Sequence, residues 1–322
     1  MLGRRALGVA AVCMAIVVAG CGSGSTATPA STGGTPASTA PSTAPSAAAS
    51  TAPSAAASTA PSAAAVSFGE CQLTGTPGKY HLQTVAPGVL TIKADLPSAG
   101  WWNGDTVTSI KSGYEYCLAA EIAYRSGLTS LDLQNVSFDQ LVSGKLTGFD
   151  MSLDEISITP ARQQVFDFSD PYYNSYIGVL AKAGANVTAA NLTGLRLGVK
   201  QGTAAQQWVQ DTLKPSQEPS VYPGDSEALA AVAAGRIDAY LQDVAIELGQ
   251  AKQSGGQVAV VGQYKTDQAY GILMPKGSPN LATVNQILAD CKADGTLDQL
   301  TKTYLGPAFG GDPSSVPVWP LP

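Results

Sequence analysis

An arginine near the start of a helix is the residue whose surroundings most clearly indicate chemistry in this sequence. Residues 156–162 have the sequence ISITPAR, and residues 166–172 continue it with FDFSDPY. Proline is favoured at the first helical position, so Pro160 predicts a helix that carries Arg162 in its first turn. A helix start attracts anions, and a guanidinium can hold a carboxylate with two parallel hydrogen bonds. The segment therefore predicts a carboxylate clamp, with an ordinary surface arginine as the alternative.

The arginine segment and two others resemble the motifs of the type II periplasmic amino-acid-binding proteins, the solute receptors of ABC importers. The other two are residues 198–203, GVKQGT, and residues 235–243, GRIDAYLQD. The three motifs occur in the family's order, and the resemblance extends over residues 90–306. It implies an α/β fold of two lobes, of the type II periplasmic-binding-protein kind, in which the chain crosses the hinge twice.

A receptor for free amino acids must fix opposite charges on a concave, partly dry surface, because its ligand carries a carboxylate and an ammonium group. The resemblance implies that Arg162 and Ser157 hold the α-carboxylate and that Asp243 receives the α-ammonium group. It also implies that Gly202 and Thr203 complete the carboxylate site from the second lobe. Each of Ser157, Asp243 and Thr203 has a simpler alternative role, which is to cap the helix that follows it.

Five more residues are expected around the ligand on the same resemblance. Asp95 corresponds to a polar residue at the mouth of the site, and Phe138 lies near a family aromatic position. Trp101 or Trp102 is expected to form the apolar wall, with burial in the scaffold as the alternative. Glu155 stands where many relatives have a small or neutral residue. A carboxylate there favours a cationic or amine-bearing ligand, unless the side chain points into solvent.

The predicted function is capture of a polar amino acid, or a related small amine-carboxylate, by closure of the two lobes and delivery to an ABC permease. One rival is a cyclohexadienyl or arogenate dehydratase on the same fold, for which Glu155 is the one candidate acid or base. A ligand-sensing domain is another. No Ser/His/Asp or metal-ligand set accompanies the motifs, so we expect neither catalysis nor a cofactor. Lys200 is expected to lie in solvent.

The first 66 residues are expected to lie outside the globular part. Residues 1–20 have the charged start and short apolar run of an export signal, and VAGC at 18–21 resembles the bacterial lipoprotein box. We therefore expect a lipid on Cys21 that holds the protein at the outer face of the cytoplasmic membrane. Residues 21–66, rich in Ala, Ser, Thr and Pro, predict a disordered linker. Residues 67–182 and 273–322 are assigned to lobe 1, and residues 183–272 to lobe 2.

The charge balance excludes one class of partner. The chain has 18 basic and 24 acidic residues, and removal of Arg4 and Arg5 with the signal leaves a net charge of −8. No basic cluster is present, so we expect no nucleic-acid binding. The acidity is typical of a solvated surface, and we expect a monomer.

Three cysteines remain for the globular part, Cys71, Cys117 and Cys291, and they permit one disulfide and one free thiol. Spacing alone does not choose the pair. Cys291 lies among apolar residues of a helical pattern, where an unpaired cysteine is usually buried. We therefore favour a Cys71–Cys117 bridge. No C-x-x-C spacing is present, so metal binding is not expected.

The hydrophobic pattern alternates between strands and helices, which favours α/β lobes. Strands are expected at 90–95, 131–136, 149–153, 176–181, 195–200, 237–241, 258–261 and 270–274. Helices are expected at 113–125, 138–145, from 203 onwards, 227–234, 280–293 and 296–304. Residues 310–322 form a tail rich in proline and glycine, and the pattern does not decide whether it packs on a lobe.

Overall fold

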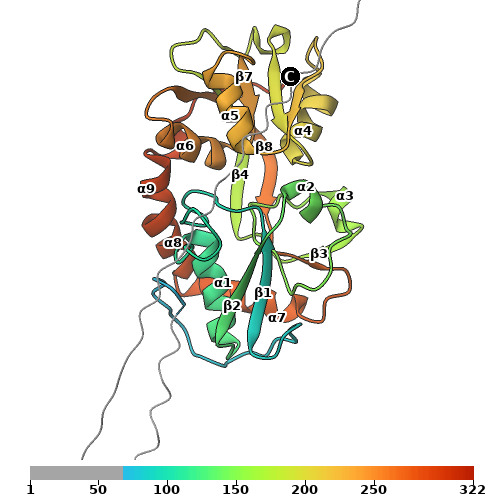
Figure 1. The fold of residues 1–322 in the computed structure, drawn as a ribbon, viewed down its shortest axis with the longest axis vertical. Coiled ribbons are helices and arrows are strands. Elements are labelled where there is room, and N and C mark those ends of the chain that lie inside the picture. Colours follow the sequence, from blue (N-terminus) through green and yellow to red (C-terminus); the bar gives the residue numbers. More distant parts are fainter. Residues whose placement is uncertain (1–67) are drawn as a thin grey trace, which may run out of the picture. The chain divides into compact units, whose positions relative to one another are not determined.

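Three sheets organise residues 68–322, the part of the chain that the computed structural model describes (Figure 1). All of these residues fall within one compact unit. The predicted signal at 1–20 and the lipid site at Cys21 lie outside the described residues, as does the linker at 21–66. Among the described residues, no helix is both long and apolar enough to cross a membrane.

The first lobe surrounds a parallel pair of strands, β1 (Val89–Ala94) and β2 (Ser130–Asn135). Leu90 and Ile92 of β1 are fully buried in the same core as α1 (Tyr114–Arg125), which begins one residue after the start of the expected helix. A second small sheet pairs β3 (Phe166–Phe168) with β9 (Leu273–Pro275). The helices of this lobe are α2 (Phe138–Leu141), α3 (Pro160–Gln163), α7 (Leu281–Ala293), α8 (Thr296–Leu300), the π-helical turn Thr301–Leu305 and α9 (Gly306–Phe309).

The second lobe is built on a six-stranded mixed sheet with the order β10-β8-β4-β7-β5-β6. Its strands are β4 (Tyr173–Lys182), β5 (Leu197–Lys200), β6 (Ser220–Tyr222), β7 (Ala239–Leu241), β8 (Val258–Tyr270) and β10 (Val318–Trp319). Its helices are α4 (Ala204–Trp208), the π-helical turn Val209–Leu213, α5 (Asp225–Ala233) and α6 (Val244–Gln253), and short 3-10 turns lie at Leu192–Gly194 and Pro313–Ser315.

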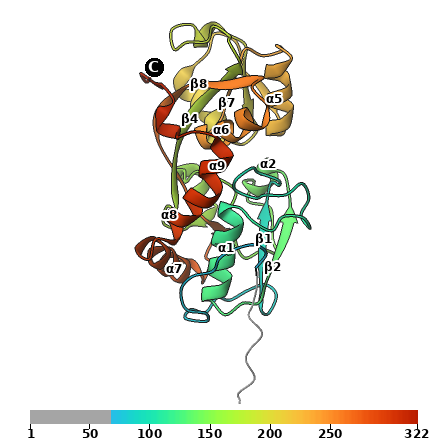
Figure 2. The same ribbon diagram turned by 90° about the vertical axis from the view of Figure 1, so that its left-hand side faces the viewer.

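The long strands β4 and β8 connect the lobes (Figures 1 and 2). They pair in antiparallel fashion from Tyr173 opposite Tyr270 to Lys182 opposite Val258. Tyr173 and Tyr270 pack in the core of the first lobe, whereas Ile177 of β4 packs in a core of the second. Each strand therefore has one end in each lobe. The expected division placed residues 173–182 wholly in lobe 1. They form β4, which begins in the core of the first lobe and continues into the sheet of the second.

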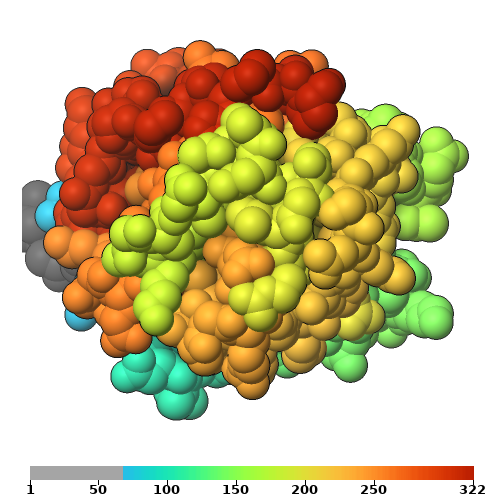
Figure 3. Space-filling model, turned by 90° about the horizontal axis from the view of Figure 1, so that it is seen from above, coloured from blue at the N-terminus to red at the C-terminus, as the bar shows by residue number. Residues whose placement is uncertain are grey.

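The C-terminal tail packs on the second lobe, whereas the expected division placed all of residues 273–322 in lobe 1 and the hydrophobic pattern left the packing of the tail open. β10 pairs in parallel with β8, and the indole of Trp319 fills the space over Gly262 and meets Tyr264 edge to face. Figure 3 shows this end of the chain, in red, along the surface of the lobe. Since α9 belongs to the first lobe, the tail makes a further connection between the lobes.

Most expected elements are present, and the differences have physical reasons. The segment expected as a strand at 149–153 makes only isolated bridges, to Ile92 and Leu273. The two strands expected at 258–261 and 270–274 are instead the continuous β8, because the polar residues between them pair with β4, and the short β9. The helix after Asp243, α6, was not among the helices expected from the hydrophobic pattern, and it entered only through the alternative role of Asp243 as a helix cap.

One disulfide joins Cys71 to Cys117, which confirms the favoured pairing. It closes a loop with a sequence separation of 46, worth about 4 kcal/mol in the loop-entropy description. Cys291 is a buried free thiol, as the helical pattern indicated. The bridge ties the segment before β1 to α1, the helix behind the first strand pair.

Candidate functional site

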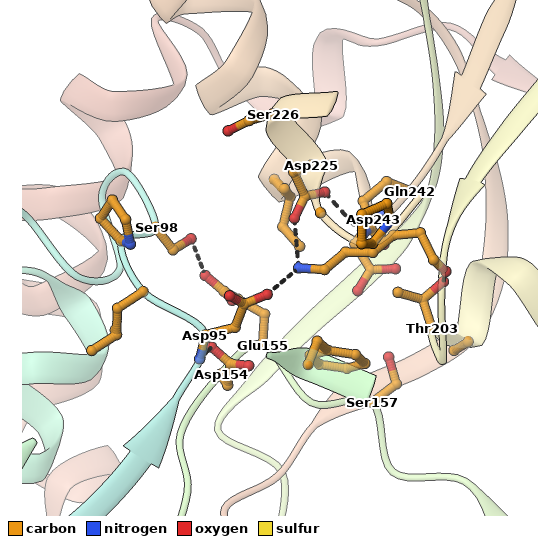
Figure 4. A pocket seen from close by; sticks show the side chains of 18 of the residues that line it. Asp95, Ser98, Asp154, Glu155, Ser157, Thr203, Asp225, Ser226, Gln242 and Asp243 are labelled. Atoms are coloured by element: carbon orange, nitrogen blue, oxygen red, sulfur yellow. Dashed lines mark hydrogen bonds and ion pairs between the residues drawn. The ribbon is translucent and has the colours of Figure 1, made fainter. Parts of the chain in front are cut away.

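A cavity of about 300 Å³ lies between the two lobes. The first lobe lines it with the turn after β1, the segment before α3 and Phe138 of α2, and the second lobe with the ends of β5 and β7 and the start of α5. Figure 4 shows this cavity from close by. Its polar lining residues are Asp95, Ser98, Asp154, Glu155, Ser157, Arg162, Lys200, Thr203, Asp225, Ser226, Glu227, Gln242 and Asp243.

Arg162 is held in the cavity wall by main-chain groups. Pro160 starts α3 as expected, and the Thr159 hydroxyl caps the helix by accepting the Arg162 N–H at 3.2 Å. The guanidinium donates from Nη1 to the Ser157 carbonyl at 2.7 Å and from Nη2 to the Gly202 carbonyl at 2.9 Å. Burial lowers the pKa of Arg162 to about 10. Within residues 68–322 it forms no salt bridge, so no carboxylate of the described chain neutralises this buried cation.

Asp243 faces the same cavity from the second lobe. It is the residue before α6, yet its side chain does not cap that helix. Instead Oδ2 accepts a hydrogen bond from the Tyr270 hydroxyl at 2.8 Å, and Oδ1 is buried without a partner among the described residues. Burial raises the pKa of Asp243 to about 7, against the opposing effects of the Tyr270 hydrogen bond and the Arg162 charge. The carboxyl group thus has one free, desolvated oxygen.

Lys200 corrects an expectation, because it is buried rather than solvated. Its Nζ lies 2.7 Å from Asp95 Oδ2 of the first lobe and 2.7 Å from Asp225 Oδ2 of the second (Figure 4). Burial lowers the pKa of Lys200, but the charges of Asp225 and Asp95 outweigh this effect and raise it above its ordinary value. The lysine is therefore a charged bridge between the lobes.

Glu155 is buried in the cavity wall and does not point into solvent. Its Oε1 accepts a hydrogen bond from the Ser98 hydroxyl at 2.6 Å, and its main-chain N–H donates to Glu115 Oε1 at 2.9 Å. Burial, and then the charges of Glu115 and Asp154, raise the pKa of Glu155 well above its usual range. Asp154 beside it accepts the Asp95 N–H through Oδ1 and has no partner for its buried Oδ2.

The other expected residues take different places. The buried Ser157 hydroxyl lines the cavity and has no hydrogen-bond partner in the part of the chain that the structure describes. Thr203 also lines the cavity, but its hydroxyl caps α4 by accepting the Gln206 N–H at 3.1 Å. Gly202 contributes its carbonyl to Arg162 from a left-handed conformation, φ 77°. The Phe138 ring lies under that guanidinium, 5.3 Å from its Cζ.

The two tryptophans do not line the cavity. Both are fully buried in the core of the first lobe. Trp101 meets Tyr114, Tyr173 and Tyr270 edge to face, and Trp102 Nε1 donates to Glu115 Oε2 at 2.7 Å. They form scaffold behind the site, which is the alternative that their size and polar N–H left open.

Sequence reasoning missed Asp154, Asp225, Gln242 and Ser98 as lining residues. Asp225 had a usable signal, because it begins the helix that follows β6 and could have been placed at the cavity edge. Asp154 and Ser98 lie in irregular segments, where no periodicity tells which way a side chain points.

Comparison with known proteins places these features in a family. The family model for bacterial extracellular solute-binding proteins, family 3, matches residues 107–307. The L-cystine-binding protein TcyJ of Escherichia coli K12 is 30% identical over 200 residues, which span 61% of this chain and 74% of that protein. The ABC transporter arginine-binding protein 1 of the same strain is 32% identical over 177 residues, 53% of this chain and 72% of that protein.

Solved structures agree with the sequence comparison. An ancestral arginine-binding protein bound to arginine has a TM-score of 0.62 and 27% identity, and the match covers 67% of this chain and 98% of that one. The ancestral amino-acid-binding protein AncCDT-1, a precursor of cyclohexadienyl dehydratase, has a TM-score of 0.60 and 26% identity, over 68% and 95% of the two chains. The fold is thus the type II periplasmic-binding-protein fold that the motifs predicted.

Proposed function

Because the chain belongs to the bacterial extracellular solute-binding proteins of family 3, we propose that it captures a polar amino acid, or a related small amine-carboxylate, and delivers it to an ABC permease. One observation carries this proposal: Arg162 and Asp243 approach a single cavity from opposite lobes, each with unfilled bonding capacity. A volume of about 300 Å³ suits a small ligand.

The α-carboxylate binds at Arg162. Two main-chain carbonyls fix the plane of the guanidinium, and its remaining N–H groups are left to bind the ligand carboxylate. The Ser157 hydroxyl, buried without a partner, donates a second hydrogen bond to the carboxylate. A carboxylate here neutralises a cation that burial would otherwise leave uncompensated, which is a costly arrangement in a protein interior.

The α-ammonium group binds at Asp243. Tyr270 holds one carboxyl oxygen in place, and the other is free to accept from the ligand. Since the two poles of the ligand are bound by different lobes, binding favours the arrangement in which the lobes meet, by hinge motion along β4 and β8. The closed form then docks on the permease.

The relatives support the class of ligand without selecting one member. Their names specify cystine for one and arginine for another, and they match this chain with similar identities. We further propose that the protein is exported and lipid-anchored through Cys21, at the end of the VAGC segment, and that it works as a monomer. Membrane tethering would keep the captured solute close to its permease.

The test is calorimetry and thermal shift with the twenty amino acids. A tight ligand raises the melting temperature by mass action. Arg162→Ala is expected to weaken binding by at least about 100-fold, because a buried ligand carboxylate loses its partner. The matched control is Arg236→Ala, which removes an exposed arginine and is expected to leave affinity unchanged. Equal affinity in the Arg162 and control variants would refute the assignment.

A dehydratase is the one rival with a specific observation behind it. Glu155 is a cavity carboxyl with a raised pKa, as a general acid requires, and one structural neighbour is a dehydratase precursor. Incubation with arogenate separates the two functions. We expect no conversion to phenylalanine, and turnover that Glu155→Gln abolishes would establish the enzyme instead.

A further inference from the structure

The side of the cavity away from Ser157 and Thr203 carries a second group of polar residues. In Figure 4, Ser98 and Glu155 lie on the left, and Ser157 and Thr203 on the right. A ligand whose carboxylate binds at Ser157 therefore directs its side chain towards Glu155.

The backbone at Glu155 is unusual. Its φ is 45°, in the left-handed region, and among residues 68–322 only one other non-glycine residue has a positive φ. This conformation is strained in a non-glycine residue. Here the N–H of Glu155 is fixed by Glu115, and its carboxyl group is fixed in the cavity wall by Ser98. The chain thus keeps a strained residue that presents a carboxyl group at this end.

The charges of the cavity do not balance. Two cations line it, Arg162 and Lys200, against six carboxyl groups. Lys200 is already shared between Asp95 and Asp225, and Arg162 donates to two carbonyl groups. Within the described residues, neither cation forms a salt bridge with Glu155. The six acidic residues are Asp95, Asp154, Glu155, Asp225, Glu227 and Asp243.

Asp154 provides an independent sign of a missing partner. It is only 2% exposed, lines the cavity next to Glu155, and its Oδ2 has no hydrogen-bond partner within the described residues. A buried carboxyl oxygen of this kind is costly unless a donor reaches it. A cationic group carries several donors and a positive charge, and it would offset both the open bond and the excess of acid.

Resting on the proposed function, we infer that Glu155, Asp154 and Ser98 form a side-chain subsite for a positively charged group. The ligand class is then the amino acids with a second amine or a guanidinium. In this arrangement Glu155 determines specificity, and Lys200 keeps Asp95 and Asp225 from competing for the same cation.

The experiment uses calorimetry on the full chain with three matched ligand pairs. These are lysine against norleucine, arginine against citrulline, and ornithine against glutamine. We expect each cationic member to bind about 10- to 100-fold more tightly than its neutral partner, the range of a charge-assisted hydrogen bond. Neutral members that bind as tightly as the cationic ones would overturn the inference, and this comparison needs no variant.

Glu155→Gln provides the second arm. It should remove most of the cationic preference while the affinity for the neutral ligands changes less than about threefold. Glu218→Gln is the matched control, since it removes the same charge from an exposed position outside the cavity lining. Equal losses for cationic and neutral ligands in Glu155→Gln would assign the residue a structural role and overturn the inference.

The outcomes also separate this inference from the function on which it rests. Neutral amino acids that bind in an Arg162-dependent way, without cationic preference, would leave the proposed function intact and reject the subsite. Failure of every amino acid to bind would reject both.

Discussion

Two buried arginines in this molecule have opposite surroundings. Arg125, 2% exposed, lies at the end of α1 in the first lobe, and Arg162, 8% exposed, lies in the cavity wall. Arg125 forms salt bridges with Glu121 at 2.9 Å and Asp294 at 2.8 Å, and also donates to Thr74 and Thr296. Arg162 contacts two carbonyl oxygens and no carboxylate.

The pKa directions of the two arginines follow from this difference. Burial lowers the pKa of Arg125, but its hydrogen bonds to Glu121 and Asp294 outweigh burial and raise it overall. Burial lowers the pKa of Arg162, and the more distant charge of Asp243 does not compensate. A charge that serves the fold is thus neutralised within the chain. On the proposed function, Arg162 is the charge that a ligand carboxylate neutralises, and within residues 68–322 no carboxylate pairs with it.

The largest expected effect comes from removing each arginine in turn. Arg125→Met should destabilise the empty protein by about 3–5 kcal/mol, because Glu121 remains buried and loses its partner. Arg162→Met should leave the melting temperature of the empty protein unchanged or raise it, since no buried anion is abandoned. The Arg162→Met variant should instead bind the ligand more weakly. Thermal unfolding without ligand, combined with calorimetry, measures both quantities.

The comparison would fail if both variants lost stability equally. That result would mean that Arg162 holds the lobes together through its bond to Gly202 and acts as a structural residue. Arg236→Met, at an exposed position, gives the baseline for the loss of a charge.

The second prediction concerns pH and the free oxygen of Asp243. Burial raises its pKa to about 7 in the empty cavity. The ligand ammonium group binds the ionised carboxylate, so below pH 7 binding must first expel a proton. Affinity should fall by up to about tenfold for each pH unit below 7 and level off above it. Four neighbouring groups also act on the pKa of Asp243. The Tyr270 hydrogen bond and the charges of Arg162 and Lys200 lower it, and the charge of Asp225 raises it.

Calorimetry at pH 5, 6, 7 and 8 with an amino acid that has a neutral side chain isolates this effect from Glu155. Asp243→Asn should bind weakly at every pH and show no slope. A wild-type affinity that is flat from pH 5 to 8 would mean that Asp243 is not the ammonium partner.

The sequence predicted the parts of this site that local rules describe. Pro160 and Thr159 start α3 by capping rules that act within four residues, so the position of Arg162 could be anticipated. Lys200 could not be placed in the same way. A lysine at the end of a short strand is normally solvated, but here Asp225 of its own lobe and Asp95 of the opposite lobe both enclose it. Contacts of this kind depend on how the two lobes meet, which no local pattern encodes.

Trp102 also could not be placed from local patterns, because it was expected at the ligand and lies in the core of the first lobe. A tryptophan near a strand end suits either a ligand wall or a core. The deciding contact is its hydrogen bond to Glu115, whose burial follows from the packing of α1 and not from spacing. Side chains whose partners lie on other elements were therefore the ones left open or misplaced.

The smallest expected effect tests whether an unfilled bond by itself marks a binding site. Glu247 of α6 is fully buried and away from the cavity lining, its Oε1 accepts the N–H groups of Leu180 and Gln242, and its Oε2 has no partner. Burial raises the pKa of Glu247 well above its usual range, so the folded protein binds a proton that the unfolded chain releases above about pH 4.3. Its contribution to stability is therefore greatest at low pH and falls, by up to about 1.4 kcal/mol per pH unit, as pH rises towards the folded pKa.

Glu247→Gln should match the wild type in melting temperature at pH 5, exceed it at pH 8 and bind ligand with unchanged affinity. A change in affinity would mean that a buried carboxyl group away from the cavity also affects ligand binding. The absence of a partner within the chain would then not be enough to tell binding residues from structural ones.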